Sequence, residues 1–104
     1  MYTEEPHVDD VARLEGSTLL DFGTPWCGHC QQAAPMTAEF VARCGIRHIG
    51  VEDGRGRPLG RAFRVKLWPT LVLLKDGEEQ ARVVRPQAHA DLETLVRTVA
   101  ATAR

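Results

Sequence analysis

The sequence predicts an α/β fold in which a mixed central sheet of four to five strands is flanked by helices on both faces. Three short apolar segments, at residues 18–23, 46–52 and 70–74, have the length and composition of buried strands. The residues between them show helical spacing or turn composition, which is the alternation typical of an α/β chain. An Asp76-Gly77 pair after the third segment indicates a tight hairpin, and hence an antiparallel strand beside the parallel ones.

The first half of the chain is expected to contain two helices and two strands. In order these are a helix over residues 7–15, a strand over 18–23, a helix over 27–44 and a second central strand over 46–52. Gly16 stops the first helix and Gly45 the second, since glycine readily ends a helix. Pro35 lies inside the second helix and is expected to kink it, because proline lacks a backbone N–H donor.

The second half is expected to form a loop, a short helix, a hairpin and a closing helix. These are the loop 53–58, the short helix 59–63, the strand 70–74, the return strand 81–85, and a helix with Leu92, Leu95, Val96 and Val99 on one face. The strand 70–74 is apolar throughout, so both of its faces can be buried. The closing helix repeats apolar residues at i, i+3, i+4 and i+7, which is an amphipathic pattern.

Length and composition indicate an ordinary globular protein. The 104 residues suffice for one domain, residues 1–104, with a core that needs no disulfide bonds. Hydrophobic residues make up 43% and charged residues 26% of the chain, and the net charge of −1 gives no general attraction to nucleic acid. No stretch approaches the length of a membrane span, and the acidic start lacks the apolar run of a secretory signal. We therefore expect a cytoplasmic monomer without cofactor or metal.

Cys27 and Cys30 carry the clearest chemical signal in the chain. Their C-x-x-C spacing places the second sulfur one helical turn from the first, close enough for a disulfide. If Cys27 stands at a helix N-terminus, the free N–H groups and the helix dipole favour its thiolate, which is the reactive form. An odd total of three cysteines argues against a secreted disulfide scaffold. The pattern of strand, turn, C-x-x-C and helix indicates a redox-active pair.

Over nearly its whole length the chain resembles the thioredoxin family. The residues that carry the match are Asp21-Phe22, Trp26-Cys27-Gly28-His29-Cys30, Pro35, Trp68-Pro69-Thr70 and Lys75-Asp76-Gly77-Glu78. The C-x-x-C alone is moderately specific, whereas its combination with the proline five residues later and the X-Pro-Thr segment is highly specific. The resemblance implies the thioredoxin fold, a cis peptide bond before Pro69 that faces the disulfide, and thiol–disulfide oxidoreductase activity.

The resemblance implies catalytic roles for four residues. Cys27 would form a mixed disulfide with the substrate, and Cys30 would resolve it. Asp21, in an apolar strand, would lie beneath the disulfide and help move the proton of Cys30. His29 makes the site similar to those of protein disulfide isomerases, whereas thioredoxins have proline between the cysteines. A partly protonated imidazole stabilises the thiolate, so His29 is expected to make the pair more oxidising.

The resemblance also implies a flat substrate groove beside the cysteines. Trp26 is expected to pack beside the motif and shield the sulfurs. The residue before the proline would offer its main chain to an extended substrate peptide. The groove would be lined by Trp26, Gly28, Trp68, Pro69 and Thr70. The expected partners are therefore protein thiols and disulfides, together with a reductase or another thiol electron donor.

Four residues depart from the family pattern. Trp68 replaces a small or branched residue and is expected to crowd the groove and narrow substrate choice. Arg85 stands where a glycine is common, and it could add positive charge near Cys27 or hinder a partner. His48 replaces a lysine that often accompanies the buried aspartate; it would make proton transfer sensitive near neutral pH or would be a plain core or edge residue. Gln31 replaces a common lysine.

Two alternatives come from other functional classes. Cys27, Cys30, Cys44 and His48 also fit C-x2-C-x13-C-x3-H, a spacing compatible with a structural zinc site of three cysteines and one histidine. That alternative leaves Asp21 and the X-Pro-Thr segment without a role. The second alternative is a thioredoxin-like chaperone or adaptor that catalyses no reaction. Such a protein would need no intact C-x-x-C. In the redox interpretation Cys44 is a small buried apolar residue.

Overall fold

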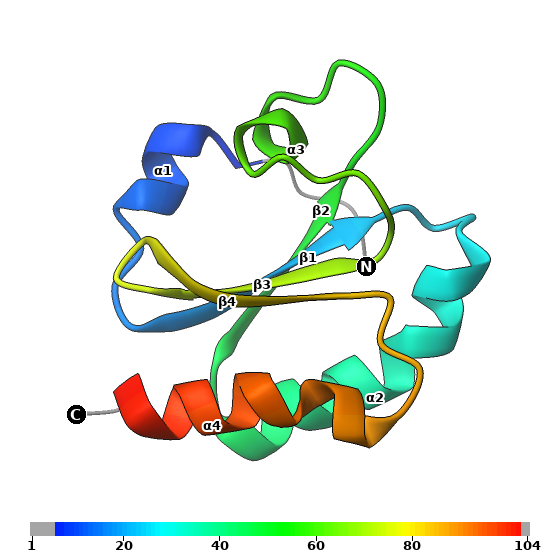
Figure 1. Ribbon diagram of the computed structural model, residues 1–104. Helices are drawn as coiled ribbons and strands as arrows, with labels where there is room; N and C mark the ends of the chain where they lie inside the picture. Colours follow the sequence, from blue (N-terminus) through cyan, green and yellow to red (C-terminus); the bar gives the residue numbers. More distant parts are fainter. Residues whose placement is uncertain (1–5, 103–104) are drawn as a thin grey trace.

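A computed structural model describes residues 6–102 of the chain (Figure 1). Its elements are α1 (Val8–Ala12), β1 (Ser17–Gly23), α2 (Gly28–Cys44), β2 (Arg47–Glu52), α3 (Pro58–Ala62), β3 (Thr70–Lys75), β4 (Glu78–Val84), a 3-10 turn (His89–Leu92) and α4 (Glu93–Thr102). Every helix and strand expected from the sequence is present, in the expected order.

The strands form one mixed sheet in the order β2-β1-β3-β4. β1 and β2 run parallel, whereas β3 is antiparallel to both β1 and β4. The expected mixed sheet is confirmed, with four strands among residues 6–102. The prediction that β2 is central is wrong, because β2 is an edge strand of the described sheet. Only Gly50 and Val51 of this strand are buried, so its apolar run is too short to be covered on all sides.

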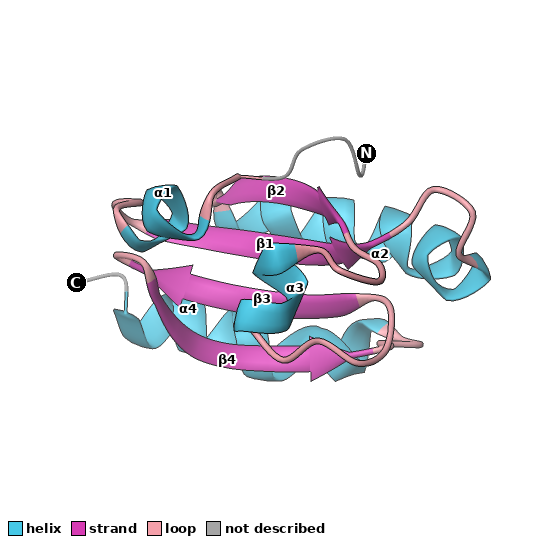
Figure 2. Cartoon of the chain, turned by 90° about the horizontal axis from the view of Figure 1, so that it is seen from above, coloured by secondary structure: helices cyan, strands magenta, loops and turns pink. Residues whose placement is uncertain are grey.

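Helices cover both faces of the sheet, as expected. α1 and α3 lie on one face and α2 and α4 on the other (Figures 1 and 2). Successive side chains of a strand point to opposite faces. Leu19 of β1 accordingly packs with Phe40 of α2 and Leu95 of α4, whereas Leu20 packs with Val11 of α1 and Leu59 of α3. The core is therefore two apolar layers, one on each side of the sheet.

α2 is the helix that carries the cysteine pair, and its bounds agree with the predicted 27–44. Cys27 is its N-cap, and Gly45 ends it in the left-handed conformation with a φ of 64°. The Gly45 N–H donates to the carbonyl of Ala42, which satisfies one of the free carbonyls of the last turn. Although α2 has 17 residues, neither it nor any other helix of residues 6–102 is long and apolar enough to cross a membrane.

β4 begins three residues before its predicted start. Asp76 and Gly77 reverse the chain with positive φ angles of 52° and 82°. Pairing therefore resumes at once, with Glu78 opposite Lys75. The polar residues at the start of β4 are exposed, so the apolar pattern used for the prediction could not include them.

Candidate active site

The cysteine pair lies where β1 leads into α2. Cys27 has extended backbone angles (φ −81°, ψ 119°) as the N-cap of the helix, and its Sγ accepts a hydrogen bond from the backbone N–H of Cys30 at 3.2 Å. The N–H groups of a first helical turn lack acceptors within the helix and carry the positive end of its dipole. The Cys27 sulfur therefore lies at the positive end of the helix dipole, within reach of a backbone N–H donor.

The two cysteines differ in access to solvent. Cys27 is 8% exposed and Cys30 is 1% exposed. Gly28 and His29 between them are exposed on the first turn of α2. Gln31 follows, and its Nε2 donates to the carbonyl of Pro25 at 2.8 Å, which braces the loop before the motif. A partner thus meets Cys27 before Cys30.

Asp21 is a buried carboxylate on the face of the sheet that α2 covers. It stands two residues after Leu19, which packs against α2, so both side chains point to the same face. Gly50 is paired with Asp21 across the β1–β2 ladder and has no side chain, which leaves room for His48 on the same face. His48 Nε2 lies 3.0 Å from Asp21 Oδ2. From the sequence, His48 is expected either to accompany the buried aspartate or to be a plain core or edge residue. The structure shows it beside the aspartate.

Trp68 packs against the cysteine pair. Trp68 contacts the buried cysteine pair, whereas Trp26 is 72% exposed and meets the Trp68 ring edge to face, with centroids 5.6 Å apart. The shielding of the sulfurs by Trp26 stays a prediction. The indole N–H of Trp68 donates to Asp53 Oδ2 at 2.8 Å, and this bond orients the Trp68 ring.

The segment before β3 is held from two sides. The Trp68–Pro69 peptide bond is cis. Thr70 is buried, and its hydroxyl donates to the carbonyl of Leu67 at 2.6 Å. From the end of β4, the Arg85 backbone N–H donates to the carbonyl of Pro69 at 2.9 Å, and Arg85 Nε donates to the carbonyl of Trp68 at 2.9 Å. The main-chain carbonyl expected to meet substrate therefore already has one internal donor.

Cys44 and His48 do not join the cysteine pair. Cys44 is in the last turn of α2, and at 1.5 Å per residue the helix places it about 21 Å from Cys30. His48 faces Asp21 instead. Among residues 6–102, no group of three or more His, Cys, Asp or Glu side chains is arranged to hold a metal ion. The zinc alternative is therefore wrong. Cys44 packs beside the apolar layer between the sheet and α2.

The thioredoxin family model matches residues 1–98. The chain belongs to the thioredoxin family. Among solved structures it is similar to thioredoxin 2 from Pseudomonas aeruginosa PAO1 in its reduced form, with 51% identity, a TM-score of 0.84, and coverage of 96% of this chain and 95% of that one. A thioredoxin of Haemophilus influenzae is 39% identical over 92 residues, which are 79% of this chain and 84% of the relative. Protein disulfide-isomerase erp38 of Neurospora crassa is 34% identical over 98 residues, 88% of this chain and 26% of that protein.

These matches confirm the thioredoxin fold and the enzyme class expected from the sequence, a thiol–disulfide oxidoreductase. The family match spans the elements that build the site, from β1 through the Trp68–Pro69 segment and β4. In this thioredoxin-family protein the cysteine pair, the buried aspartate and the cis-proline segment therefore lie within the matched region.

One site residue was missed by reasoning from the sequence. Asp53 falls in a loop that composition alone defines, and nothing in its local pattern distinguishes it from other loop acids. The structure bonds it to Trp68, fifteen residues further along the chain. The sequence feature that could have pointed to such a residue is Trp68, because a buried indole N–H requires a hydrogen-bond acceptor. A search for that acceptor needs the tertiary structure.

Proposed function

We propose that this protein catalyses dithiol–disulfide exchange on protein substrates, with Cys27 as the attacking thiolate and Cys30 as the resolving thiol. The hydrogen bond from the Cys30 N–H to Cys27 Sγ, at the start of α2, supports this most directly. It stabilises negative charge on the sulfur that a partner meets first.

The proposed reaction has two exchange steps. The Cys27 thiolate attacks one sulfur of the substrate disulfide; the substrate S–S bond breaks, and its other sulfur leaves as a thiolate that takes up a proton. Cys30 then loses its proton and attacks the Cys27 sulfur of the mixed disulfide. The second substrate thiolate leaves, so the substrate has gained two electrons and the enzyme holds a Cys27–Cys30 disulfide. A reductase or another thiol donor reverses this oxidation.

Asp21 and His48 are proposed to serve the second step. A buried carboxylate on the α2 face can accept the proton that Cys30 must lose. His48, 3.0 Å from Asp21, would tune that transfer as the charge of its imidazole changes.

We further propose that the site is of the protein disulfide isomerase type. His29 is exposed next to the cysteines, and an imidazolium there stabilises the reduced, thiolate form of the pair. Thioredoxin has a potential of about −270 mV and protein disulfide isomerase about −180 mV. We expect a potential between these values and nearer the second.

The proposed substrate surface comprises Trp26, Gly28, Trp68, Pro69 and Thr70. Trp26 and Gly28 offer exposed contacts, whereas Thr70 acts through its bond to Leu67. The exposed aromatic surface beside Cys27 suits an extended segment of protein substrate. We propose that residues 1–104 act as one domain, as a monomer, in the cytoplasm.

Cysteine variants assayed by insulin reduction test this proposal. Cys27→Ser should abolish activity, and Cys30→Ser should accumulate mixed disulfides that a reducing agent releases. Cys44→Ser is the matched control, because Cys44 lies at the far end of α2, and it should retain wild-type activity. Full activity in Cys27→Ser would contradict the proposed role of Cys27. A wild type without turnover, whose binding of partners survives loss of both cysteines, would contradict the proposal and favour the adaptor alternative.

A further inference from the structure

Arg85 is held in one position beside the cis-proline segment. Its φ of 51° lies in the left-handed region that favours glycine. This backbone turn brings the side chain back over the segment before β3. The backbone N–H of Arg85 donates to the carbonyl of Pro69, and Nε donates to the carbonyl of Trp68. The guanidinium is therefore fixed against the residue that contacts the cysteine pair.

Most donors of this guanidinium remain available. An arginine side chain has five N–H donors in a planar fork, and Arg85 uses the one on Nε for Trp68. Among residues 6–102, no carboxylate pairs with Arg85 and no second acceptor is bonded to its side chain. Asp53, the acid at this site, is bonded to the indole of Trp68 instead. The N–H groups on the two terminal nitrogens of the Arg85 guanidinium are thus available to bind an anion from another molecule.

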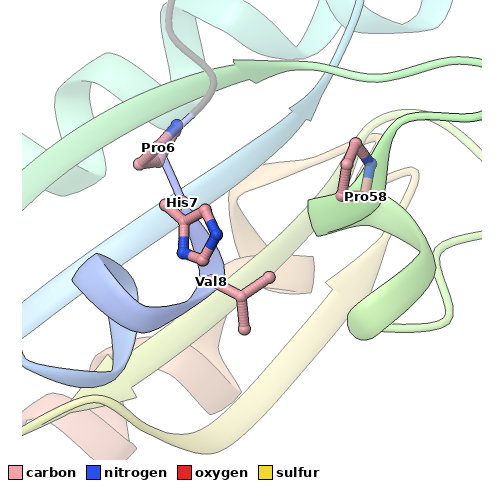
Figure 3. Close-up of a pocket in the computed structure, with 4 residues that line it drawn as sticks. All are labelled: Pro6, His7, Val8 and Pro58. Atoms are coloured by element: carbon pink, nitrogen blue, oxygen red, sulfur yellow. The ribbon is translucent and has the colours of Figure 1, made fainter.

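The surface around Arg85 is suited to a protein segment. Among residues 6–102, three of the four exposed large apolar side chains adjoin Arg85, Trp68 or Cys27 in the chain: Val84 (44% exposed), Leu67 (49%) and Trp26 (72%). The fourth, Val8, lines a shallow hollow with Pro6, His7 and Pro58 between α1 and α3 (Figure 3). That hollow has one titratable side chain, and its Nδ1 already accepts the N–H of Asp9, so it offers little chemistry for a ligand.

We propose that Arg85 is a specificity-determining residue that binds a carboxylate of the substrate, so that disulfides flanked by aspartate or glutamate are preferred. The inference rests on the proposed function. A guanidinium and a carboxylate can form two parallel hydrogen bonds, and the fork of Arg85 is already oriented. Trp68 contacts both Arg85 and the cysteine pair. Because Arg85 is bonded to the residue that contacts the cysteine pair, we expect the acid to be close to the target cysteine in the substrate.

Matched peptide disulfides test this proposal. At each of the three positions on either side of the target cysteine, one peptide carries Glu and its partner carries Gln, and kcat/KM is measured with the full chain. We expect the Glu peptide to be preferred about three- to tenfold at one or two neighbouring positions, with a preference that falls as salt is raised. Arg85→Gln and Arg85→Gly should bring the ratio of kcat/KM for the Glu and Gln peptides close to one.

Arg64→Gln is the matched control. Arg64 is also an arginine with a positive φ, of 56°, and it is exposed. Its loss changes the net charge equally and should leave the Glu preference intact. Reduction of all peptides without any preference, or a preference that survives in both Arg85 variants, would overturn the role of Arg85 and leave the proposed function standing. Failure of the wild type to reduce any peptide would overturn both.

Discussion

His48 Nε2 lies 3.0 Å from Asp21 Oδ2, and the two side chains are 19% and 2% exposed. Their strands are neighbours, and Asp21 is paired across the ladder with Gly50, two residues after His48. Lysine, the residue that family resemblance suggests here, keeps its charge throughout the neutral range, whereas histidine changes charge between about pH 5 and pH 8. The structure therefore has an imidazole, in place of an ammonium group, beside the buried carboxylate near the cysteine helix.

The first prediction concerns the pH dependence of turnover. The pH profile of disulfide reduction should change in shape between about pH 5 and pH 8 when His48 is replaced by lysine, which keeps its charge in that range. The change should stay well below the roughly 100-fold of direct acid–base catalysis, because the imidazole acts through Asp21. His89→Gln is the control, since His89 lies 3.9 Å from Glu39 but is exposed. Coincident profiles for wild type and His48→Lys would refute the assignment.

His29 is predicted to set the redox potential. His29→Pro should make the pair more reducing and move it toward the thioredoxin value of about −270 mV. His29→Gln keeps a polar side chain but cannot become charged, so it should produce most of the same shift if the imidazolium charge is the cause. Potentials are measured by equilibration with glutathione. A potential that is unchanged in both variants would show that the exposed imidazole has no electronic effect.

Gly77 is predicted to be required at the β3–β4 turn. Its φ is 82°, and a Cβ at this position would collide with the backbone carbonyl of Ala12. Gly77→Ala should lower the free energy of unfolding by more than about 1 kcal/mol. Gly16→Ala is the matched control, because Gly16 also has a positive φ, of 75°, but open space at its Cβ position. Urea unfolding should show the larger loss for Gly77→Ala, and equal losses would rule out the collision.

Asp91 is predicted to stabilise the start of the C-terminal helical region in a pH-dependent way. The backbone N–H groups of Gln87 and Ala88 donate to Asp91 Oδ2 at 2.8 and 3.0 Å and hold the pKa of this carboxyl below its usual value. A carboxyl whose pKa is lower in the folded than in the unfolded state stabilises the fold at pH values above the unfolded pKa. This stabilisation is lost as the pH falls through the folded pKa.

The measurement is the stability of Asp91→Asn against wild type as a function of pH. The difference should be largest at neutral pH and should shrink below about pH 4, as the carboxyl of the wild type becomes protonated. Asp10→Asn serves as control, because Asp10 has only an exposed partner, Arg13, at 3.6 Å. A stability difference for Asp91→Asn that does not vary with pH would contradict the assignment.

The parts of the fold that depend on local pattern could be predicted from the sequence. The strand before the cysteines, the helix between Cys27 and Gly45, and the hairpin at Asp76-Gly77 all follow from periodicity, capping and turn chemistry. The order of strands in the sheet is a non-local property. The apolar residues of β2 predict a strand at the centre of the sheet. In the described sheet, however, β2 pairs with β1 alone and is an edge strand.

The site divides in the same way. The cysteine spacing and the position of Asp21 are local signals, and the location of His48 follows once β1 and β2 are paired. The packing of Trp68 against the cysteines could not be predicted, because Trp68 and its hydrogen-bond partner Asp53 lie in loops that only the folded chain brings to the cysteine pair. The bond from Arg85 to the carbonyl of Trp68 likewise joins segments that only the folded chain brings together.

The most direct test of the central claim is a redox titration of the wild-type protein in glutathione buffers. Tryptophan fluorescence can report the transition, because Trp68 packs against the cysteine pair and contacts Trp26. We predict a reversible two-electron transition between about −270 and −180 mV, nearer the second value, which Cys30→Ser abolishes. No reversible transition, or one that persists in Cys30→Ser, would contradict a Cys27–Cys30 dithiol–disulfide couple.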